Sequence, residues 1–176
     1  MTESVRIIGI DPGSVVTGWG VIDSDGRSSH HVAHGAIATG SGSLPERLGV
    51  IQREVAAVIL EHRPAEMGIE EVFLARNAMS ALKLGQARGA AICAGVAADL
   101  PVGEYPARLV KQTLVGVGGA GKEQMQHMVK VLLGLTGKLQ ADAADALGIA
   151  LCHAHARTRP APVLSAARRR KSVRWK

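Results

Sequence analysis

The chain contains very few aromatic residues. Of its 176 residues only 2% are aromatic, namely Trp19, Phe73, Tyr105 and Trp175. A hydrophobic core must therefore be built from aliphatic residues, alanine and glycine, which favours close packing of helices. With 47% hydrophobic and 20% charged residues, the composition excludes an intrinsically disordered chain and indicates a folded domain.

Long apolar runs are also missing. No run approaches the roughly 20 apolar residues that cross a bilayer, and residues 1–6 lack the pattern of a signal peptide. The two cysteines, Cys93 and Cys152, both fall inside apolar helical patterns. We expect them to be reduced core residues of a cytoplasmic protein, with neither a disulfide framework nor a zinc site.

The net charge of +6 is unevenly distributed along the chain. Residues 1–71 carry five basic and ten acidic groups, residues 72–138 carry eight and three, and residues 157–176 carry eight and none. An acidic cluster beside a basic surface suits a polyanion whose phosphate is handled by metal ions. For residues 157–176 taken alone, we favour a flexible, solvated basic tail that follows a single domain at 1–156.

The hydrophobic patterns predict an α/β domain with a mixed five-stranded sheet and helices on both faces. Strands are expected at 5–11, 17–22 and 29–38, joined as an antiparallel meander, and later at 67–70 and 101–105. Helices are expected from the capping box at 43–46 to before Pro64, at 80–98, after Pro106, around 125–133 and at 140–156. The sequence shows no internal repeat and no second domain.

Four acids are the candidate catalytic and metal-binding residues. Asp11 and Glu70 end two predicted strands, and Asp142 and Asp145 lie three residues apart on one helix face. If the fold brings them together they repel one another, and hard divalent cations relieve that repulsion. Two-metal phosphodiester hydrolysis uses such a set, with Asp11 as the candidate bridging ligand. Taken singly, each acid also has an ordinary interpretation as a turn former or a helix N-terminal charge.

Several segments resemble the RuvC family of Holliday junction resolvases. They are Ile8–Ser14 with Thr17–Gly20, Ile69–Phe73, Ser80–Gly89 and Gln140–Leu147, and the match is collinear from about residue 6 to 155. The central segment and Asp-Ala-Ala-Asp are specific, whereas Asp-Pro-Gly alone is a weak signal. The chain departs from the family in its Ala/Gly-rich interior and its Arg-rich end.

The resemblance implies a ribonuclease H-like fold and a homodimer that nicks two opposing strands of a four-way junction symmetrically. It implies Mg²⁺, two ions per active site with Mn²⁺ as a possible substitute, a preference for cytosine and thymine context, and the branch-migration motor RuvAB as a partner. The family's four catalytic acids correspond to Asp11, Glu70, Asp142 and Asp145. The register of Val72-Phe73 selects Glu70 over its neighbour Glu71.

Six residues are candidate DNA contacts: Phe73, Arg76, Lys83, Arg88, Lys111 and Lys122. Phe73 is similar to a stacking residue of the family, and stacking on a base contributes about 1–3 kcal/mol. The alternative for Phe73 is a core position at a strand end. Lys111 and Lys122 resemble lysines near the scissile phosphate, and their alternative is a pair of solvated lysines.

Two further patterns are rejected as sites. Residues 116–122 match a nucleotide-binding P-loop until Glu123 replaces the Ser or Thr, and the preceding residues are typical of a helix where a P-loop needs a strand. No nucleotide is therefore expected, although a glycine loop entering a helix suits a DNA phosphate. His153 and His155 do not face each other on a helix, so we expect surface residues and no metal pair.

Two other functions fit part of the sequence. An actin-like ATPase or sugar kinase also has Gly-Ile-Asp-Pro-Gly before a β-turn-β, but this chain lacks the second domain of that class. A non-catalytic junction-binding protein of the same fold is the other alternative, and retention of all four acids counts against it. The sequence thus predicts a magnesium-dependent endonuclease of recombination and repair that acts on four-way junctions.

Overall fold

A mixed sheet of five strands forms the centre of the protein. The computed structural model describes residues 3–71, 78–119 and 121–158. The strands are β1 (Val5–Asp11), β2 (Val16–Ser24), β3 (Ser29–Ala38), β4 (Glu66–Glu70) and β5 (Val102–Tyr105). Their order is β3-β2-β1-β4-β5, with β1, β2 and β3 antiparallel and with β4 and β5 parallel to β1. The predicted meander and mixed sheet are confirmed.

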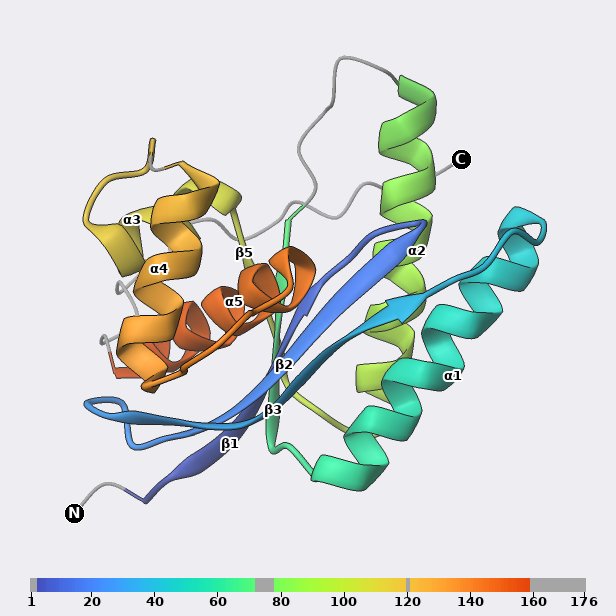
Figure 1. Ribbon diagram of the computed structural model, residues 1–176. Coiled ribbons are helices and arrows are strands. Elements are labelled where there is room, and N and C mark those ends of the chain that lie inside the picture. The colour runs from blue at the N-terminus through green and yellow to red at the C-terminus, as the bar shows by residue number, and fades with distance from the viewer. Residues whose placement is uncertain (1–2, 72–77, 120, 159–176) are drawn as a thin grey trace, which may run out of the picture.

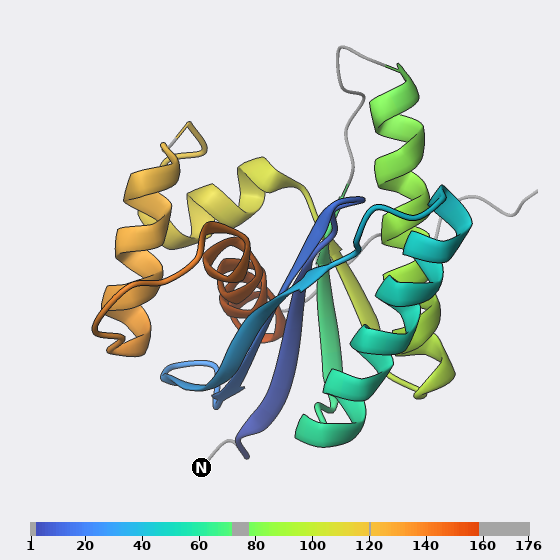
Figure 2. The ribbon, with the colours of Figure 1, turned by 45° about the vertical axis from the view of Figure 1, so that its right-hand side comes forward.

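Helices cover both faces of this sheet. They are α1 (Leu44–His62), α2 (Ala78–Ala97), α3 (Ala107–Val115), α4 (Lys122–Leu133) and α5 (Ala141–Thr158). Figures 1 and 2 show α1 and α2 together on one face, whereas α5 crosses the other face with α3 and α4 outside it. The predicted placement of helices on both faces of the sheet is therefore confirmed.

Alternation along each strand divides the core into two halves. On β1, Ile7 packs with α3, α4 and α5, whereas Ile8 and Ile10 pack with α1 and α2. On β4, Met67 and Ile69 likewise belong to the α1–α2 half. Because successive strand side chains point to opposite faces, the intervening residues of both strands face α5.

Glycines in the sheet let α5 lie unusually close to it. An ideal Cβ on Gly9 would collide with the backbone of Ala146 and would lie 2.6 Å from the backbone nitrogen of Ala150. A Cβ on Gly18 would collide with the backbone carbonyl of Asp142. These two strand positions therefore have no room for a side chain, and this places the N-terminal turn of α5 directly over the β1–β2 pair.

The structure corrects two predictions of burial. Cys93 is exposed, because α2 turns its Ala87 and Ala91 side toward the core and Cys93 lies on another side of the helix. His153 is buried at 5% exposure, since Gly68 and Gly103 leave space for its ring between α5 and the sheet. Cys152 is buried, as expected.

The buried His153 ring takes part in a polar network. Its Nε2 lies 2.7 Å from the carboxylate of Glu66 on β4, and its Nδ1 lies 2.9 Å from the hydroxyl of Tyr105 on β5. Arg157 donates from Nε to the same Glu66 carboxylate at 2.9 Å. Burial lowers the pKa of His153, so these contacts describe a neutral ring that links α5 to both strands.

Most predicted boundaries fall within two residues of the observed ones. The helix after the capping box begins as expected, with the backbone N–H of Ser43 donating to the Glu46 carboxylate at 2.7 Å. The last helix continues to Thr158, two residues beyond the expected domain boundary at 156. The expected tail was 157–176, and its residues 159–176 lie outside the described residues.

Within the described part of the chain, no helix combines the length and apolar character needed to span a membrane.

Candidate active site

Strand register places Asp11 and Glu70 side by side. Ile10 of β1 pairs with Ile69 of β4 in parallel register, so the next residue on each strand is Asp11 and Glu70. Both side chains follow residues of the α1–α2 half, and alternation turns them toward α5. Adjacent strands lie about 4.8 Å apart. Two carboxylates therefore meet at one end of the sheet, on one face.

Helix α5 brings the other two acids to the same place. The backbone of Asp142 lies against Gly18, and Gly18 is the β2 partner of Asp11. Asp145 follows one helical turn later and projects from the same side as Asp142. The convergence of strand ends and a helix face that the sequence required is present.

A pocket opens where these elements meet. It encloses about 250 Å³, and its lining includes Asp11, Glu70 and Asp145 together with Lys111 of α3 and Lys122 of α4. The remaining lining residues are Ala107, Val110 and Met125. Acids from the sheet and α5 thus face two lysines from the α3–α4 pair across one open space.

The acids of this pocket are electrostatically strained. Burial, followed by the negative charges of Glu70, Asp145 and Asp142, raises the pKa of Asp11 to about 7, although Lys122 opposes the rise. Burial also raises the pKa of Glu70, with the charge of Asp145 next in size. In the described structure no Lys, Arg or His forms an ion pair with any of the four acids. Their mutual repulsion is left uncompensated by direct partners.

The pKa of Asp145 follows the same pattern. Burial raises this pKa, the positive charge of Lys122 lowers it, and Asp142 raises it again. Lys111 also acts to lower it. The two lysines are therefore close enough to stabilise the acids by charge without pairing with one of them.

The donor set fits divalent cations that keep part of their water. Among the described residues, no group of three or more His, Cys, Asp and Glu side chains is arranged tightly enough to hold an ion alone. Mg²⁺ is usually bound by one or two carboxylates, with water and substrate phosphate completing its coordination, and does not need such a cage. Half-buried acids with raised pKa values match this use.

Residues missed by the sequence analysis brace the turn that follows Asp11. The buried Thr17 hydroxyl donates to the carbonyl of Gly13 at 2.9 Å, and the Thr39 hydroxyl donates to that of Ser14 at 3.0 Å. Arg47 of α1 donates to Thr39 at 3.1 Å and also to the Ser14 carbonyl. In the sequence, Thr17 close to the turn residues Gly13 and Ser14 was the feature that could have predicted these hydrogen bonds.

The glycine segment between α3 and α4 is confirmed to follow a helix. Residues before it form α3, which ends at Gly116 with φ of 82°, a conformation that suits glycine. Gly121 then caps α4 without a side chain, and Lys122 is the first residue of that helix. Unpaired N–H groups and the positive end of α4 therefore lie beside the pocket that Lys122 lines.

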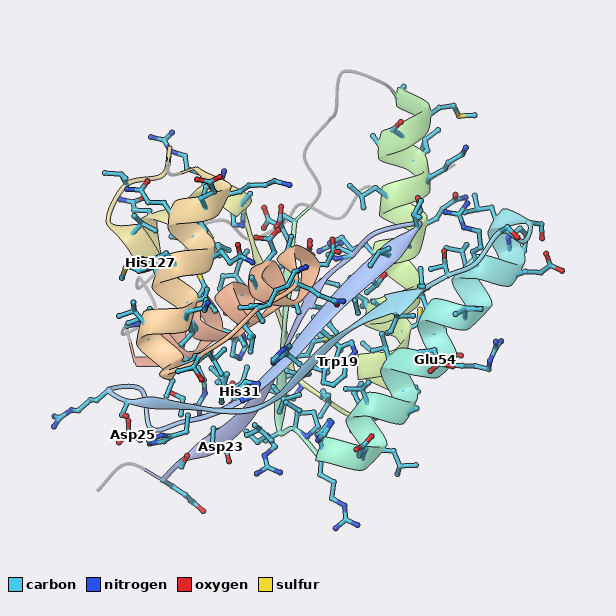
Figure 3. The ribbon with its side chains drawn as sticks, in the orientation of Figure 1. Trp19, Asp23, Asp25, His31, Glu54 and His127 are labelled. Carbon is cyan, nitrogen blue, oxygen red and sulfur yellow. The ribbon has the colours of Figure 1, made fainter. Side chains whose placement is uncertain are left out.

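The other expected DNA contacts are dispersed. Lys83 is exposed on α2, whereas the Arg88 side chain is 17% exposed and bonded within the protein. Phe73 and Arg76 lie outside the described residues. Figure 3 shows that other acids, Asp23 and Asp25, lie near the β2–β3 hairpin, away from the end of β1 that carries Asp11.

Comparison with known proteins agrees with this geometry. Residues 7–153 match the family model described as crossover junction endodeoxyribonuclease RuvC. The chain is 58% identical over 165 residues to the RuvC protein of Pseudomonas putida strain F1, covering 93% of this chain and 95% of that relative. It is also 57% identical over 165 residues to the RuvC protein of Pseudomonas entomophila.

Solved structures give the same result. Thermus thermophilus RuvC in complex with a Holliday junction substrate matches with a TM-score of 0.82 and 36% identity, covering 87% of this chain and 94% of that one. The yeast mitochondrial Holliday junction resolvase Ydc2 shares the fold, with a TM-score of 0.63 and 12% identity over 86% of this chain and 78% of that one. With the sheet order, the acidic pocket and these matches in agreement, the chain belongs to the RuvC family of crossover junction endodeoxyribonucleases, which has a ribonuclease H-like fold.

Proposed function

We propose that the protein resolves Holliday junctions by hydrolysing phosphodiester bonds of four-way DNA during recombination and repair. The observation that carries this proposal is a pocket lined by Asp11, Glu70 and Asp145, with Asp142 near enough on α5 for its charge to raise the pKa of Asp11. Burial and mutual repulsion raise the pKa values of three of them, so the pocket favours positive charge. The proposed location is the cytoplasm, which is consistent with membership of this DNA-acting family.

The four carboxylates are the proposed ligands of Mg²⁺, with Mn²⁺ as a substitute. When two such ions are bound, they supply an activated water and stabilise the leaving oxygen. Asp11 neighbours Glu70 across the strand pair and is influenced by the charges of both α5 acids, so it is the acid best placed to be shared. The protein contributes a rigid arrangement, because two acids stand on strands and two on one helix.

Lys111 and Lys122 are the proposed contacts of the scissile phosphate. They line the same pocket as the acids from its opposite side. The N-terminus of α4 adds unpaired backbone donors at Lys122, and such termini attract phosphate. A phosphate held there has its non-bridging oxygens near positive charge and its scissile bond near the carboxylates. Exposed Lys83 is a proposed contact farther along the DNA.

A homodimer would provide the two active sites that paired nicks require. Each chain offers one such carboxylate pocket, so symmetric cleavage of two opposing strands needs a second copy. Helix α2 supplies a suitable outer surface, with Met79, Leu82 and Val96 between 58% and 63% exposed. Cooperation with the RuvAB branch-migration motor is proposed on family membership alone.

Cleavage of a synthetic four-way junction by Asp142→Asn tests this function. Loss of one metal ligand should slow cleavage in Mg²⁺ by about 10³-fold, since metal stabilisation is worth several kcal/mol. Junction binding should be retained, because the variant removes a negative charge that repels DNA. Asp23→Asn is the matched control, as Asp23 is paired with Arg6 far from the pocket.

Other outcomes decide against the proposal. Undiminished cleavage by Asp142→Asn would remove the carboxylate mechanism. Junction binding without any cleavage by the wild type in Mg²⁺ or Mn²⁺ would favour a non-catalytic binding protein. ATP hydrolysis by the wild type would favour the actin-like alternative.

A further inference from the structure

Arg88 lies on the inner side of α2, next to the end of β4. Its neighbours Ala87 and Ala91 are fully buried against the sheet. Farther along α2, a Cβ on Gly95 would lie only 2.7 Å from the sulfur of Met67 on β4, so the helix approaches this strand closely. Small residues along α2 therefore bring the Arg88 backbone near the strand that ends in Glu70.

The Arg88 guanidinium joins three elements of the fold. Its Nε donates to the backbone carbonyl of Glu70 at 2.8 Å. One of its Nη atoms is bonded to the carboxylate of Glu104 on β5. Glu104 is the register partner of Ile69, the residue before Glu70. Helix α2 is thus tied to the last residue of β4 and to the neighbouring strand by a single planar group.

The Arg88 contacts lie at the end of β4, where strand pairing holds the backbone of Glu70 on one side only. Glu70 is the last residue of β4, and the parallel pairing with β1 runs only as far as Ile69. On the β5 side, Glu70 pairs with Tyr105, and the N–H of Glu71 donates to the Tyr105 carbonyl at 2.8 Å. The Arg88 bond therefore adds a side-chain anchor at the carbonyl of the residue whose carboxylate enters the pocket.

Arg88 is poorly placed for a phosphate contact. Its side chain is 17% exposed, and donors on two of its nitrogens already have acceptors within the protein. Lys83 on the same helix is exposed, and so it differs from Arg88 in this respect. The positive charges that act on the Glu70 carboxylate come from Lys111 and Lys122 across the pocket. The Arg88 contacts instead concern the backbone of Glu70.

We propose that Arg88 is a positioning residue for cleavage, which fixes the backbone of Glu70 through a bond that the Glu104 carboxylate orients. The inference rests on the proposed function in one respect, namely that Glu70 is a catalytic acid. A planar guanidinium can satisfy both acceptors at once, whereas a lysine ammonium cannot reproduce this fork. Geometry at this position therefore matters in addition to charge.

Arg88→Lys separates positioning from DNA binding because it preserves the charge. We expect the single-turnover cleavage rate at saturating junction to fall about 10- to 100-fold, since small displacements of reacting groups have effects of this size. The junction Kd, measured in Ca²⁺, should change less than about 2-fold, and its dependence on salt should be unchanged because no phosphate contact is lost. Arg53→Lys, at an exposed position of α1, is the matched control and should change neither the rate nor the Kd.

Glu104 provides a second test through the other end of the contact. Glu104 is half exposed, so its substitution is compatible with folding. Glu104→Gln retains an acceptor oxygen and should slow cleavage less than Glu104→Ala, again at unchanged Kd. Adding Glu104→Ala to Arg88→Lys should have little further effect, because both changes remove the same contact. Thermal unfolding of each variant confirms that the folded protein is being assayed.

The alternatives give distinct results. A weaker Kd with a shallower salt dependence and a normal saturated rate for Arg88→Lys would overturn positioning and indicate a phosphate contact. If Glu70→Gln abolishes cleavage while both Arg88→Lys and Glu104→Ala cleave normally, the positioning role alone is wrong. Normal cleavage by Glu70→Gln would instead overturn the proposed catalytic acid.

Discussion

The two ends of the sheet handle negative charge in opposite ways. Near the β2–β3 hairpin, Arg6 donates to Asp23 at 2.8 Å and lowers its pKa, and backbone N–H groups of the turn lower the pKa of Asp25. At the other end, burial and neighbouring acids raise the pKa values of Asp11 and Glu70, and neither has an ion-pair partner among the described residues. The two groups of acids therefore differ in whether a hydrogen-bond donor or a cationic side chain pairs with the carboxylate, and not in residue type. An unpaired carboxylate is available to a cation.

The acids at the Asp11–Glu70 end of the sheet also lower the stability of the folded protein. A paired surface acid contributes between zero and about 1 kcal/mol to stability. Acids with raised pKa values destabilise the folded state at neutral pH, because the unfolded chain releases their protons more readily. This acidic end of the sheet, which carries Asp11 and Glu70, is therefore held together by the surrounding structure. The main contribution is the close packing of α5 on Gly9 and Gly18.

Substituting Gly18 with alanine should lower both cleavage and stability, because it separates the strand acids Asp11 and Glu70 from the acids of α5. The new Cβ collides with the carbonyl of Asp142, so α5 must move away from β2. We expect cleavage of a four-way junction to fall about 100-fold and stability to fall by about 1–3 kcal/mol. Gly49→Ala on α1 is the control, because its Cβ meets only the flexible end of Arg53. Equal cleavage by both variants would contradict the packing argument.

Removing Lys122 should increase the difference in pKa between the acids at the Asp11–Glu70 end of the sheet and those at the end that carries the Arg6–Asp23 ion pair. Lys122 lowers the pKa values of Asp11, Glu70 and Asp145, so Lys122→Ala should raise the pKa of Asp11 above about 7 in the metal-free protein. Carboxyl-carbon NMR titration measures this change. Cleavage should slow by about 10-fold or more, since a charge near the phosphate is lost. An unchanged Asp11 titration would place Lys122 outside the electrostatics of the pocket.

Neutralising Asp11 should stabilise the metal-free protein while it abolishes cleavage. The pKa of Asp11 is raised to about 7, so its contribution to stability is complete below the unfolded pKa of about 4 and is lost as pH rises through about 7. Asp11→Asn should therefore match the wild type near pH 4 and exceed it by about 4 kcal/mol at pH 8. Urea unfolding in EDTA measures the difference, and a gap independent of pH would refute the assignment.

Substitution of Asp23, at the end of the sheet that carries the Arg6–Asp23 ion pair, should have the smallest effect on stability and cleavage. Asp23 is about one-third exposed in its ion pair with Arg6, so Asp23→Asn should cost at most about 1 kcal/mol. The cost should disappear as pH falls through the lowered pKa of Asp23, because the wild-type carboxyl is then also neutral. Junction cleavage should stay at the wild-type rate. A cleavage defect here would mean that the two ends are coupled through β2.

Local patterns predicted the framework well because their physics is local. Alternation and turn signals located β1 and β3, and the capping box at Ser43 located the start of α1. The order of the strands in the sheet follows from the antiparallel meander of β1, β2 and β3 and the two parallel strands that come after it. Asp11 and Glu70 could be selected because strand ends and a specific family motif coincide at these residues.

What the sequence did not reveal depends on contacts between distant segments. Periodicity made Cys93 a core residue, but only the arrangement of α2 against the sheet decides which side is covered. His153 was expected at the surface, although Gly68 and Gly103, far away in sequence, leave a space for it. Arg88 was expected to contact DNA, and only the structure shows its bond to the Glu70 carbonyl, which joins segments that are distant in sequence.

Helix α2 connects the Glu70 backbone with the outer surface of the molecule. The helix has 20 residues and is therefore about 30 Å long. One side of it contacts the Glu70 carbonyl through Arg88, while exposed Leu82 and Val96 lie on its outer surface. A subunit or DNA arm that shifts or tilts this helix would displace Glu70 as well. Correct assembly and readiness for cleavage would then be linked by a mechanical connection that needs no movement of the sheet.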